Sequence, residues 1–570
     1  MKTTGAKILL NCLLEQGVDT IFGYPGGTIL NVYDELYDYN DKITHVLTCH
    51  EQGAAHAADG YARATGKVGV CFATSGPGCT NLTTGIATAF FDSSPVVFIT
   101  CNVMRSLVGR DSFQEVDIVG ITKPITKANY MVNDVERLAT VMREAFAIAR
   151  SGRPGPVLID IIKDVTSEAC EFESIPLEQH TTKVAYASHL KRGTKDLNVP
   201  KPTQKDISVL IDMVSQAKKP MIICGGGVVL SRAQNEFLEF AEKMDSPVAI
   251  TTRGAGAFRS THPLSTGMIG MHGSRASNIA IDTCDLLIAI GSRFSDRVGL
   301  KFDSFAQHAR VIHIDIDPKE INKNIKSHHH IIGDVKHVLS MVNEKLEQQD
   351  KKVWKEEIFS IETEIEYEKR PDTVTPKEAL RTLADMLPDE TIVTTDVGQH
   401  QMWAIQHFRF SYPGQLITSL GYGTMGFGLG AAIGAKTAFP KQTVLHITGD
   451  GSFLMNCNEM ATEYKYKLPV ITVVFNNNTL GMVRQWQGVF YKQRFSETDM
   501  NALPPFNKLA EAYGLRGRRV TSVDELKIAI EEAKASIAEG IGYVIDLAIW
   551  VDEVVKPMVR SGAHITDFTM

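Results

Sequence analysis

The sequence predicts an α/β protein made of three consecutive doubly wound domains, each with a parallel sheet covered by helices on both faces. One observation is that short β-branched runs, among them VGVCFAT, PVVFIT and PVLIDI, recur along most of the chain. Runs this apolar, with little alternation, are typical of parallel strands buried on both faces. A second is that helical stretches separate these runs, which indicates βα units with right-handed crossovers. A third is the length of 570 residues, because one hydrophobic core rarely organises so long a chain.

Two breaks in this rhythm predict where the domains end. Residues 167–202 are irregular, which favours a linker. Residues 343–376 are charged and helix-prone, a pattern typical of a linker with a solvated helix face. We therefore expect domains at residues 1–166, 203–342 and 377–570, the last with a C-terminal tail.

Composition excludes several classes of protein. The net charge is −7 and the pI is near 6.2, so no overall electrostatic attraction to nucleic acid or acidic membranes is expected. No apolar run approaches the ~20 residues of a membrane span, and the N-terminus lacks a signal-peptide layout. The nine cysteines contain no CxxC pair, which favours reduced thiols. We expect a cytoplasmic protein without nucleic-acid or membrane partners.

The strongest local pattern lies in the third domain. A strand over 444–448 leads into Gly449, Asp450, Gly451 and Ser452, and the next strand ends at three asparagines, 476–478. Glycines at a strand-to-helix turn let backbone N–H groups approach a phosphate. Asp450 and Asn477 add oxygen ligands of the kind that Mg²⁺ prefers. Either motif alone is more often a turn, but their spacing of about 26 residues on successive strands is specific.

This pattern resembles the cofactor motif of the thiamine-diphosphate enzymes, which is GDG, a spacer of this length, and NN. The resemblance implies that Asp450, Asn477 and the carbonyl oxygen of Thr479 hold Mg²⁺. It also implies that Gln399 and His400, in VGQHQMW, contact the diphosphate.

A carboxylate expected beside the thiamine pyrimidine ring is Glu51, in HEQGAAHAADGYAR. A glutamate at the start of a helix can also have a purely structural role, because the helix dipole stabilises its negative charge. However, GYPGG at 23–27 and TSGPGCTN at 74–81 resemble the pyrimidine-binding domain of the family. By that resemblance Glu51 promotes removal of the cofactor's C2 proton, and Gly27 lines the reaction site. In this family the two cofactor-binding domains come from different subunits, which implies a homodimer or tetramer.

Further passages narrow the resemblance to the large catalytic subunits of the acetolactate synthase (acetohydroxyacid synthase) family. They include DSFQE, GSRFSDRVGLKF, GYGTMGFGLGAAIGA and GMVRQWQ, and they cover nearly the whole chain. The resemblance implies that Gly423 and Met425 contact the cofactor and that Met425 bends it into its reactive shape. The residues implied in catalysis or substrate approach are Phe113, Gln114, Lys163, Arg297, Met482 and Trp486.

Single residues of this set have ordinary alternatives. A core methionine fits Met425, a surface lysine fits Lys163, and a core or interface tryptophan fits Trp486. Within the family pattern, Trp486 instead offers a flat apolar wall that favours 2-ketobutyrate over pyruvate as acceptor.

The middle domain resembles the FAD-binding domain of these biosynthetic enzymes, in which the flavin is structural. Glycines after a strand are weak evidence alone, but the surrounding residues match. The implied flavin contacts are Gly225, Gly226, Gly227, Met271, His272, Gly291, Arg293, Asp315 and Asp334. The chain departs from the family pattern at Thr28, where alanine is common, and at Ser295, in the run that is usually RFDDR. The histidines 328–330 favour an exposed loop over a metal site.

The resemblance implies that the chain decarboxylates pyruvate on thiamine diphosphate and transfers the hydroxyethyl carbanion to a second pyruvate or to 2-ketobutyrate. That is the first common step of branched-chain amino-acid (isoleucine and valine) biosynthesis, and a small regulatory subunit is expected. Three alternatives remain: a flavin-reducing enzyme such as pyruvate oxidase, a decarboxylase that releases aldehyde, and a non-catalytic scaffold. RFSDR and RQWQ argue against the first, an acceptor pocket at Trp486 against the second, and the presence of Glu51, Asp450 and Asn477 against the third.

Overall fold

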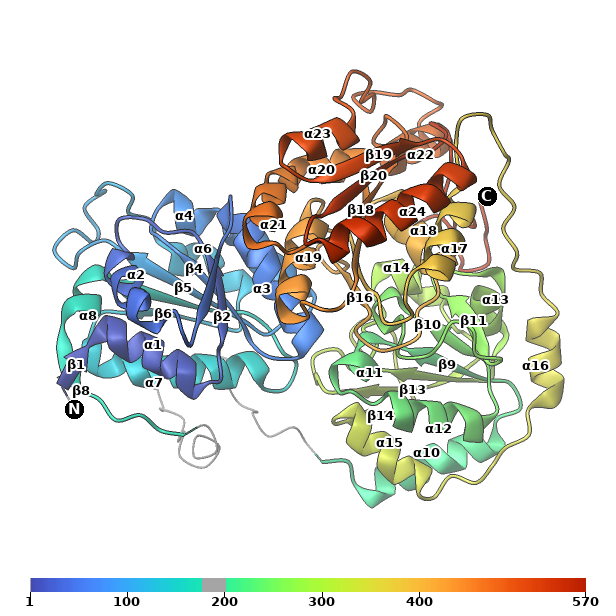
Figure 1. Cartoon of the computed structure of the whole chain (residues 1–570). Coiled ribbons are helices and arrows are strands. Elements are labelled where there is room, and N and C mark those ends of the chain that lie inside the picture. The colour runs from blue at the N-terminus through green and yellow to red at the C-terminus, as the bar shows by residue number, and fades with distance from the viewer. Residues whose placement is uncertain (1, 177–200, 570) are drawn as a thin grey trace.

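The structure is a computed structural model that describes residues 2–176 and 201–569. Three six-stranded sheets follow one another along the chain, and neighbouring strands within each sheet run parallel. Figure 1 shows the N-terminal domain in blue on one side, with the green central domain and the orange-red C-terminal domain on the other. The predicted α/β class with three parallel-sheet domains is confirmed.

The N-terminal sheet begins in sequence with β2, which lies second from one edge. In spatial order its strands are β3 (Thr44–Leu47), β2 (Thr20–Gly23), β4 (Gly69–Ala73), β5 (Val96–Asn102), β7 (Val157–Ile162) and β6 (Ala128–Val132). Its faces are covered by α1 (Gly5–Glu15) and α7 (Val135–Arg150) on one side, and by α3 (Glu51–Thr65) and α5 (Thr83–Phe91) on the other. Successive residues of the central strands point into these two separate cores, as the apolar runs predict.

The central sheet has the order β11 (Ser265–Met268), β10 (Val248–Ile250), β9 (Pro220–Cys224), β12 (Leu286–Ile290), β13 (Arg310–Asp315) and β14 (His329–Ile332). Helices α10 (Gln204–Gln216), α12 (Gln234–Met244) and α15 (Val335–Asn343) cover one face. Helices α13 (Arg275–Thr283) and α16 (Lys352–Phe359) cover the other.

The C-terminal sheet has the order β16 (Leu416–Thr418), β15 (Ile392–Thr395), β17 (Val444–Gly449), β18 (Ile471–Asn476), β20 (Tyr543–Ala548) and β19 (Arg516–Val520). On one face lie α17 (Pro376–Met386), α18 (Gln399–His407) and α24 (Val523–Ala538). The other face carries α19 (Phe427–Ala438), α20 (Asp450–Asn456), α21 (Met460–Tyr466) and α23 (Phe506–Ala512), and α22 (Gly481–Phe490) follows β18.

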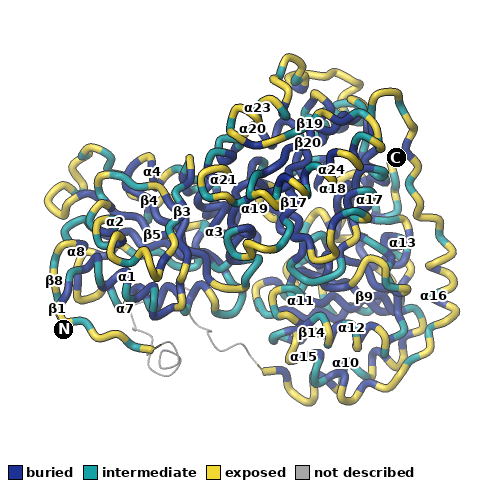
Figure 2. Tube along the Cα trace, in the orientation of Figure 1, coloured by how far each residue is buried: buried dark blue, intermediate teal, exposed yellow. Residues whose placement is uncertain are grey.

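The two segments expected as linkers contain ordered elements. In the first, β8 (Ala169–Glu171) pairs antiparallel with β1 (Lys2–Thr4), and residues 177–200 lie outside the described residues. In the second, α16 anchors itself through Trp354, whose buried indole N–H donates to the carbonyl oxygen of Pro220 at 2.8 Å. Figure 2 shows the rest of this segment largely exposed, while the sheets form the buried interior.

Helices α3 and α19 join the N- and C-terminal domains within one chain. They pack so closely that a Cβ atom at Gly434 would lie 2.0 Å from the carbonyl oxygen of Ala57. A Cβ at Gly60 would likewise lie 2.3 Å from the carbonyl oxygen of Ala431. Among the described helices, none is long and apolar enough to cross a membrane.

Candidate active site

In all three sheets the residues singled out from the sequence follow the carboxyl ends of strands. The N- and C-terminal sheets share one topology: the second strand in sequence lies outside the first, and the third lies on the first strand's other side. Strand order therefore reverses between β2 and β4, and again between β15 and β17. Open α/β sheets bind ligands at such switch points, and Gly27, Gly398 and Asp450 lie there.

Asp450 begins α20 directly after β17 and is buried. Its carboxylate accepts the backbone N–H of Gly451 at 2.7 Å and that of Thr479 at 3.2 Å. Burial raises the pKa of this carboxyl to about 6, against the effect of these N–H donors. A cation beside Asp450 would remove that disadvantage of ionisation, so the carboxylate suits a metal ligand.

Asn477 lies beside Asp450's helix and belongs to a chain of buried amides. Its Nδ2 donates to Oε1 of Gln399 at 3.3 Å, and Nε2 of Gln399 donates to Oε1 of Gln485 at 2.9 Å and to the carbonyl oxygen of Glu553 at 2.7 Å. Gln399, expected to touch diphosphate, thus has both side-chain polar atoms engaged within the protein and orients the Asn477 amide. Gln485 was not predicted.

His400 is held between two glycines. A Cβ at Gly449 would lie 2.8 Å from its Nδ1, and a Cβ at Gly398 would lie 2.9 Å from its Cε1. Burial lowers the pKa of His400 to about 4, so the ring is neutral near pH 7. Its buried Nε2 has no hydrogen-bond partner among the described residues. In the tautomer that carries its proton on Nε2, this ring would donate to the oxygen of an anionic ligand such as a diphosphate.

The remaining predicted residues of this group have mixed environments. The Ser452 hydroxyl donates to the carbonyl oxygen of Val397 at 3.1 Å, and the Thr479 hydroxyl to that of Thr498 at 2.7 Å. Gly423 is exposed, with a φ of +70°, a conformation that glycine adopts without strain, and Met425 is half-buried two residues later.

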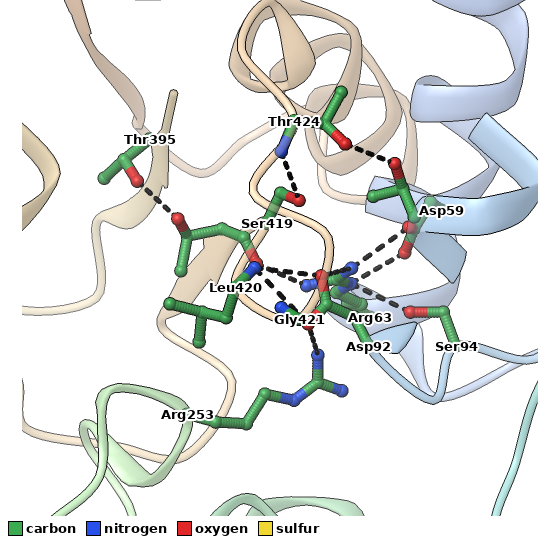
Figure 3. A network of polar contacts seen from close by, with 12 residues as sticks. Asp59, Arg63, Asp92, Ser94, Arg253, Thr395, Ser419, Leu420, Gly421 and Thr424 are labelled. Carbon is green, nitrogen blue, oxygen red and sulfur yellow. Dashed lines mark hydrogen bonds and ion pairs between the residues drawn. The ribbon is translucent and has the colours of Figure 1, made fainter. Parts of the chain in front are cut away.

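The segment before Met425 is tied to the N-terminal domain by a network that the sequence did not reveal (Figure 3). Asp92 accepts the backbone N–H of Leu420 at 3.1 Å and that of Gly421 at 2.9 Å. Arg63 pairs with Asp92 at 3.2 Å and donates to the carbonyl oxygen of Thr418 at 2.7 Å. Residues 418–421 are thereby held by buried, fully paired charges.

The charge state of Asp92 follows from these partners. Burial raises the pKa of Asp92, but the Arg63 and Arg253 guanidiniums and the two backbone N–H groups outweigh it, so the pKa lies below its usual value. Arg63 also bonds Asp59, one turn earlier on α3, at 2.6 Å. Arg253 comes from the central domain, so all three domains meet at this point.

A second group of predicted residues lies at the carboxyl end of the N-terminal sheet. Glu51, the first residue of α3, is buried and accepts the Asn81 Nδ2–H at 2.9 Å. The Lys163 ammonium donates to the carbonyl oxygen of Gly27 at 3.1 Å. The hydroxyl of Thr28, a departure from the family pattern, donates to the carbonyl oxygen of Cys101 at 2.5 Å.

The substrate residues predicted from DSFQE lie in an open loop. The Phe113 side chain is 88% exposed, and Gln114 has a φ of +60°. A Cβ at Gly76 would lie 2.8 Å from the carbonyl oxygen of Gln114, so this glycine admits the loop. Within the part of the chain that the structure describes, neither Glu51 nor Lys163 has a polar contact with the Asp450 group. One chain thus forms two separate groups.

A third group lines a cavity of about 1620 Å³ where the three domains meet. Its wall contains Gly226, Gly227, Met271, His272, Gly291, Arg293, Asp315 and Asp334, together with Arg297, Gly423, Met482 and Trp486. Gly225 does not line it; a Cβ there would lie 2.1 Å from the carbonyl oxygen of Gly291, so this glycine lets two strand-end loops meet. The cavity exceeds the roughly 300–1,000 Å³ of a pocket for one drug-sized ligand.

Charges in this cavity favour an anionic ligand. Burial, and secondarily Arg63, lowers the pKa of Arg253 to about 9, and burial followed by Arg153 lowers that of Arg293. The buried Nη1 of Arg253 has no hydrogen-bond partner among the described residues and lies 3.8 Å from Oδ1 of Asp92. Burial raises the pKa of Asp315 to about 6. Arg253 was not predicted.

At one side of the cavity, two predicted substrate residues meet. The Arg297 guanidinium carbon lies 6.0 Å from the Trp486 ring centroid, and Nη1 of Arg297 lies 3.4 Å from Sδ of Met271. The structure thus brings Arg297 and Trp486 together with the predicted flavin residues, whereas Phe113 lies in the N-terminal group.

No group of three or more His, Cys, Asp or Glu side chains arranged to hold a metal occurs within residues 2–176 and 201–569. His329 and His330 begin the edge strand β14 rather than lying in a loop. A metal at Asp450 would therefore need, besides this one carboxylate, amide or carbonyl oxygens of the protein and oxygens of a bound cofactor.

The fold and these strand-end groups define a thiamine-dependent enzyme, and comparison with known proteins agrees. Residues 3–121, 207–342 and 396–546 match the N-terminal TPP binding domain, the central domain and the C-terminal TPP binding domain of thiamine pyrophosphate enzymes. Similar proteins include the probable acetolactate synthase large subunit of Methanocaldococcus jannaschii, 44% identical over 99% of this chain and 94% of that protein. The acetolactate synthase isozyme 2 large subunit of Escherichia coli K12 is 44% identical over 98% of both chains. The acetolactate synthase large subunit of Parasynechococcus marenigrum is 45% identical over 98% of this chain and 90% of its own.

The chain belongs to the acetolactate synthase large-subunit family of the thiamine-diphosphate enzymes. The family resemblance stated from GDG, NN and RQWQ is thereby confirmed, as is dependence on thiamine diphosphate.

Proposed function

We propose that the chain is the catalytic subunit of an acetolactate synthase that joins two small 2-keto acids with loss of CO₂. One chain combines the buried Asp450 and His400 at the C-terminal switch point with the Arg297–Trp486 pair at the cavity, and this combination carries the proposal. The same chain is similar over nearly its full length to acetolactate synthase large subunits. Pyruvate is the proposed donor, and pyruvate or 2-ketobutyrate the proposed acceptor.

The C-terminal switch point is the proposed site for the cofactor's diphosphate and for Mg²⁺. Asp450, Asn477 and the Thr479 carbonyl oxygen would be the protein ligands of the ion, a hard oxygen set that suits magnesium. His400 would face the diphosphate through its unpartnered Nε2. The backbone at the start of α20, at Gly449, Gly451 and Ser452, would approach the diphosphate oxygens. When bound, thiamine diphosphate supplies a carbon nucleophile and an electron sink for the loss of CO₂.

Glu51 is the proposed acid that hydrogen-bonds the pyrimidine ring. Glu51 is buried, and among residues 2–176 and 201–569 its carboxylate accepts a hydrogen bond from Asn81 alone. One carboxyl oxygen is therefore available, at the carboxyl end of the N-terminal sheet. Gly27, Gln114 and Lys163 would flank it, and Met425 would support the cofactor from the loop that Asp92 holds. At the substrate end, Arg297 would face the carboxylate of the acceptor, and Met482 and Trp486 would bound its alkyl group.

Two copies of the chain are proposed to complete each site. The Glu51 group and the Asp450 group do not meet within one chain, and large apolar side chains around the first are exposed: Tyr24, Leu30, Met104, Leu107 and Phe113. A monomer rarely leaves so much apolar surface uncovered. The C-terminal domain of a second copy would cover it and bring Asp450 to Glu51, which makes a homodimer, or a tetramer of two such pairs, the active form.

The central cavity is proposed to hold FAD in a structural role. Backbone approach at Gly226, Gly227 and Gly291, and the guanidiniums of Arg253 and Arg293, fit its diphosphate. The name "large subunit" of the relatives supports a separate small subunit as partner, and a biosynthetic role supports a cytoplasmic location.

Product analysis of the purified protein with thiamine diphosphate, Mg²⁺ and FAD tests the proposal. Pyruvate alone should give acetolactate, and pyruvate with 2-ketobutyrate should give mostly acetohydroxybutyrate if Trp486 acts as proposed. Acetaldehyde as the product, or acetate with oxygen uptake, would instead assign a decarboxylase or an oxidase and overturn the carboligase function.

A further inference from the structure

A buried glutamate of the C-terminal domain reaches the residues that precede Glu51. Glu459 ends the short 3-10 turn Cys457–Glu459 that follows α20, and its side chain is fully buried. Its carboxylate accepts the backbone N–H of Cys49 at 3.1 Å and that of His50 at 3.1 Å. These contacts span about 410 residues of sequence and cross from the C-terminal to the N-terminal domain.

The geometry leaves this carboxylate little freedom. Oε2 also accepts the Thr462 hydroxyl at 2.6 Å, so the buried charge has donors on both oxygens. At Gly53, in the first turn of α3, a Cβ atom would lie 2.1 Å from Oε1 of Glu459. Glycine at this position is therefore what allows the carboxylate to lie against the start of the helix.

A second contact holds the same backbone segment. Tyr466, the last residue of α21, accepts the Leu47 N–H through its hydroxyl at 2.9 Å. Leu47 ends β3 and Glu51 begins α3, so the turn between them is fixed at 47, 49 and 50 by the C-terminal domain. Glu51 takes its backbone position directly from this turn.

We propose that Glu459 is a positioning residue for the reaction: its carboxylate sets the backbone at Cys49 and His50 and thereby aims Glu51 at its partner. This inference rests on the proposed role of Glu51. Glu459 touches no reacting atom, and it acts through two backbone hydrogen bonds. Asp450 lies nine residues earlier, on α20 of the same domain. The C-terminal domain of one chain would therefore fix the Glu51 turn of its own chain and carry the metal ligand of a site completed by a second copy.

Glu463 provides a matched control on the next helical turn. It is also buried, and its Oε1 accepts the backbone N–H of Val470 at 3.0 Å within the C-terminal domain. Glu463→Gln therefore makes the same substitution at a neighbouring buried site without touching residues 47–51. In Glu459→Gln, by contrast, Oε1 can still accept the His50 N–H and Nε2 can donate to the Thr462 hydroxyl. The amide NH₂ then lies against the Cys49 N–H, which in the wild type lies 3.1 Å from Oε2, and the negative charge that strengthens these hydrogen bonds is lost.

The experiment compares three holoenzyme variants, Glu51→Gln, Glu459→Gln and Glu463→Gln, by kcat, by thiamine diphosphate affinity and by deuterium exchange of the bound cofactor's C2 proton. Glu459→Gln should lower kcat and slow C2 exchange by about tenfold or more, because small misplacements of a catalytic group have effects of this size. Its thiamine diphosphate affinity should stay within about twofold of wild type. Glu463→Gln should leave the exchange rate unchanged.

The outcomes separate this inference from the proposed function. Normal turnover and exchange in Glu51→Gln would overturn the role of Glu51 and with it the basis of the inference. If Glu51→Gln is inactive but Glu459→Gln exchanges C2 deuterium as fast as Glu463→Gln, Glu459 does not position Glu51. Should Glu459→Gln prove poorly folded, Gly53→Ala gives the same test, because its Cβ displaces the Glu459 carboxylate from the turn.

Discussion

The N- and C-terminal sheets have the same strand order, yet their switch points are prepared to different degrees. In the C-terminal sheet, Asp450, Asn477, Gln399 and His400 are all buried and, except for Nε2 of His400, held by protein contacts. In the N-terminal sheet, Glu51 accepts a hydrogen bond from Asn81, while the Phe113 side chain in the neighbouring loop is exposed to solvent. The same topology thus supplies one preorganised group of buried polar residues and one face with an exposed loop.

Under the proposed function, the two sheets would contribute different parts of one reaction. A ligand-binding site for charged groups must be preorganised, because buried charges without fixed partners are unfavourable. The face that presents Glu51 needs only its backbone fixed, provided that a second copy covers it. Substitutions in the N-terminal domain and in the C-terminal domain should therefore change activity, cofactor affinity and stability in different ways.

The largest expected effect is a loss of activity on substitution of Asp450 in the C-terminal domain. Asp450→Asn removes the only carboxylate proposed to bind the metal, and kcat should fall by at least about 100-fold, since even outer-shell ligand changes weaken metal sites by 10- to 100-fold. Titration with Mg²⁺ at fixed thiamine diphosphate measures the shift. An unchanged Mg²⁺ requirement would remove Asp450 from the metal site.

A smaller effect on cofactor binding is expected from the contact between the N- and C-terminal domains at Asp92. Asp92→Asn weakens the hydrogen bonds to Leu420 and Gly421 and leaves Arg63 and Arg253 without their shared anion. We expect thiamine diphosphate to bind about tenfold more weakly, the equivalent of about 1.4 kcal/mol. Binding is followed by quenching of intrinsic fluorescence.

Asp160→Asn is the control for this change. Asp160 is equally buried in the N-terminal domain but is bonded by Thr100 and Asn102, both at 2.7 Å, within its own sheet. An equal loss of cofactor affinity in both variants would mean that the 418–421 segment does not depend on Asp92.

The junction between α3 and α19 should be sensitive to a single methyl group. Gly434→Ala places a Cβ 2.0 Å from the carbonyl oxygen of Ala57, and overpacking of this kind destabilises by about 1–3 kcal/mol. Gly488→Ala, in α22, meets no atom closer than 3.8 Å and should be neutral or slightly stabilising. Urea unfolding measures both, and equal midpoints would contradict the close packing.

The last expected effect is a pH dependence of stability. Burial raises the pKa of Glu463 to about 8 from an ordinary value of 4.5. Between these values the folded state keeps a proton that the unfolded state releases, so this group lowers the free energy of unfolding as pH rises, by at most about 1.4 kcal/mol per unit. Wild type should therefore lose more stability than Glu463→Gln between pH 5.5 and 7.5. Parallel losses would show that Glu463 ionises normally in the fold.

Much of the C-terminal site could be predicted because its signals are local. GDG and NN lie at the ends of successive strands, and the carboxyl ends of parallel strands meet at one edge. Asp450, Asn477 and His400 are accordingly found together. Their roles as ligands stay predictions.

Contacts between domains could not be predicted in this way. Asp92 with Leu420 and Glu459 with Cys49 join residues more than 300 positions apart. In the sequence, nothing distinguishes Asp92 and Glu459 from surface carboxylates. Their partners Leu420 and Cys49 come from the opposite domain, so only the packing of the N- and C-terminal domains brings them together. Gln485 was missed for the same reason, because an amide in RQWQ shows no partner until α22 is placed beside α18.

The most direct test of the divided site is complementation between two inactive variants. Glu51→Gln and Asp450→Asn chains are unfolded together in equal amounts, refolded, and assayed for acetolactate. If each site combines the N-terminal half of one chain with the C-terminal half of another, half of the dimers are mixed and each holds one intact site, so about one quarter of wild-type activity returns. Activity no greater than the sum of the separate variants would place both groups of a site in one chain and contradict the division.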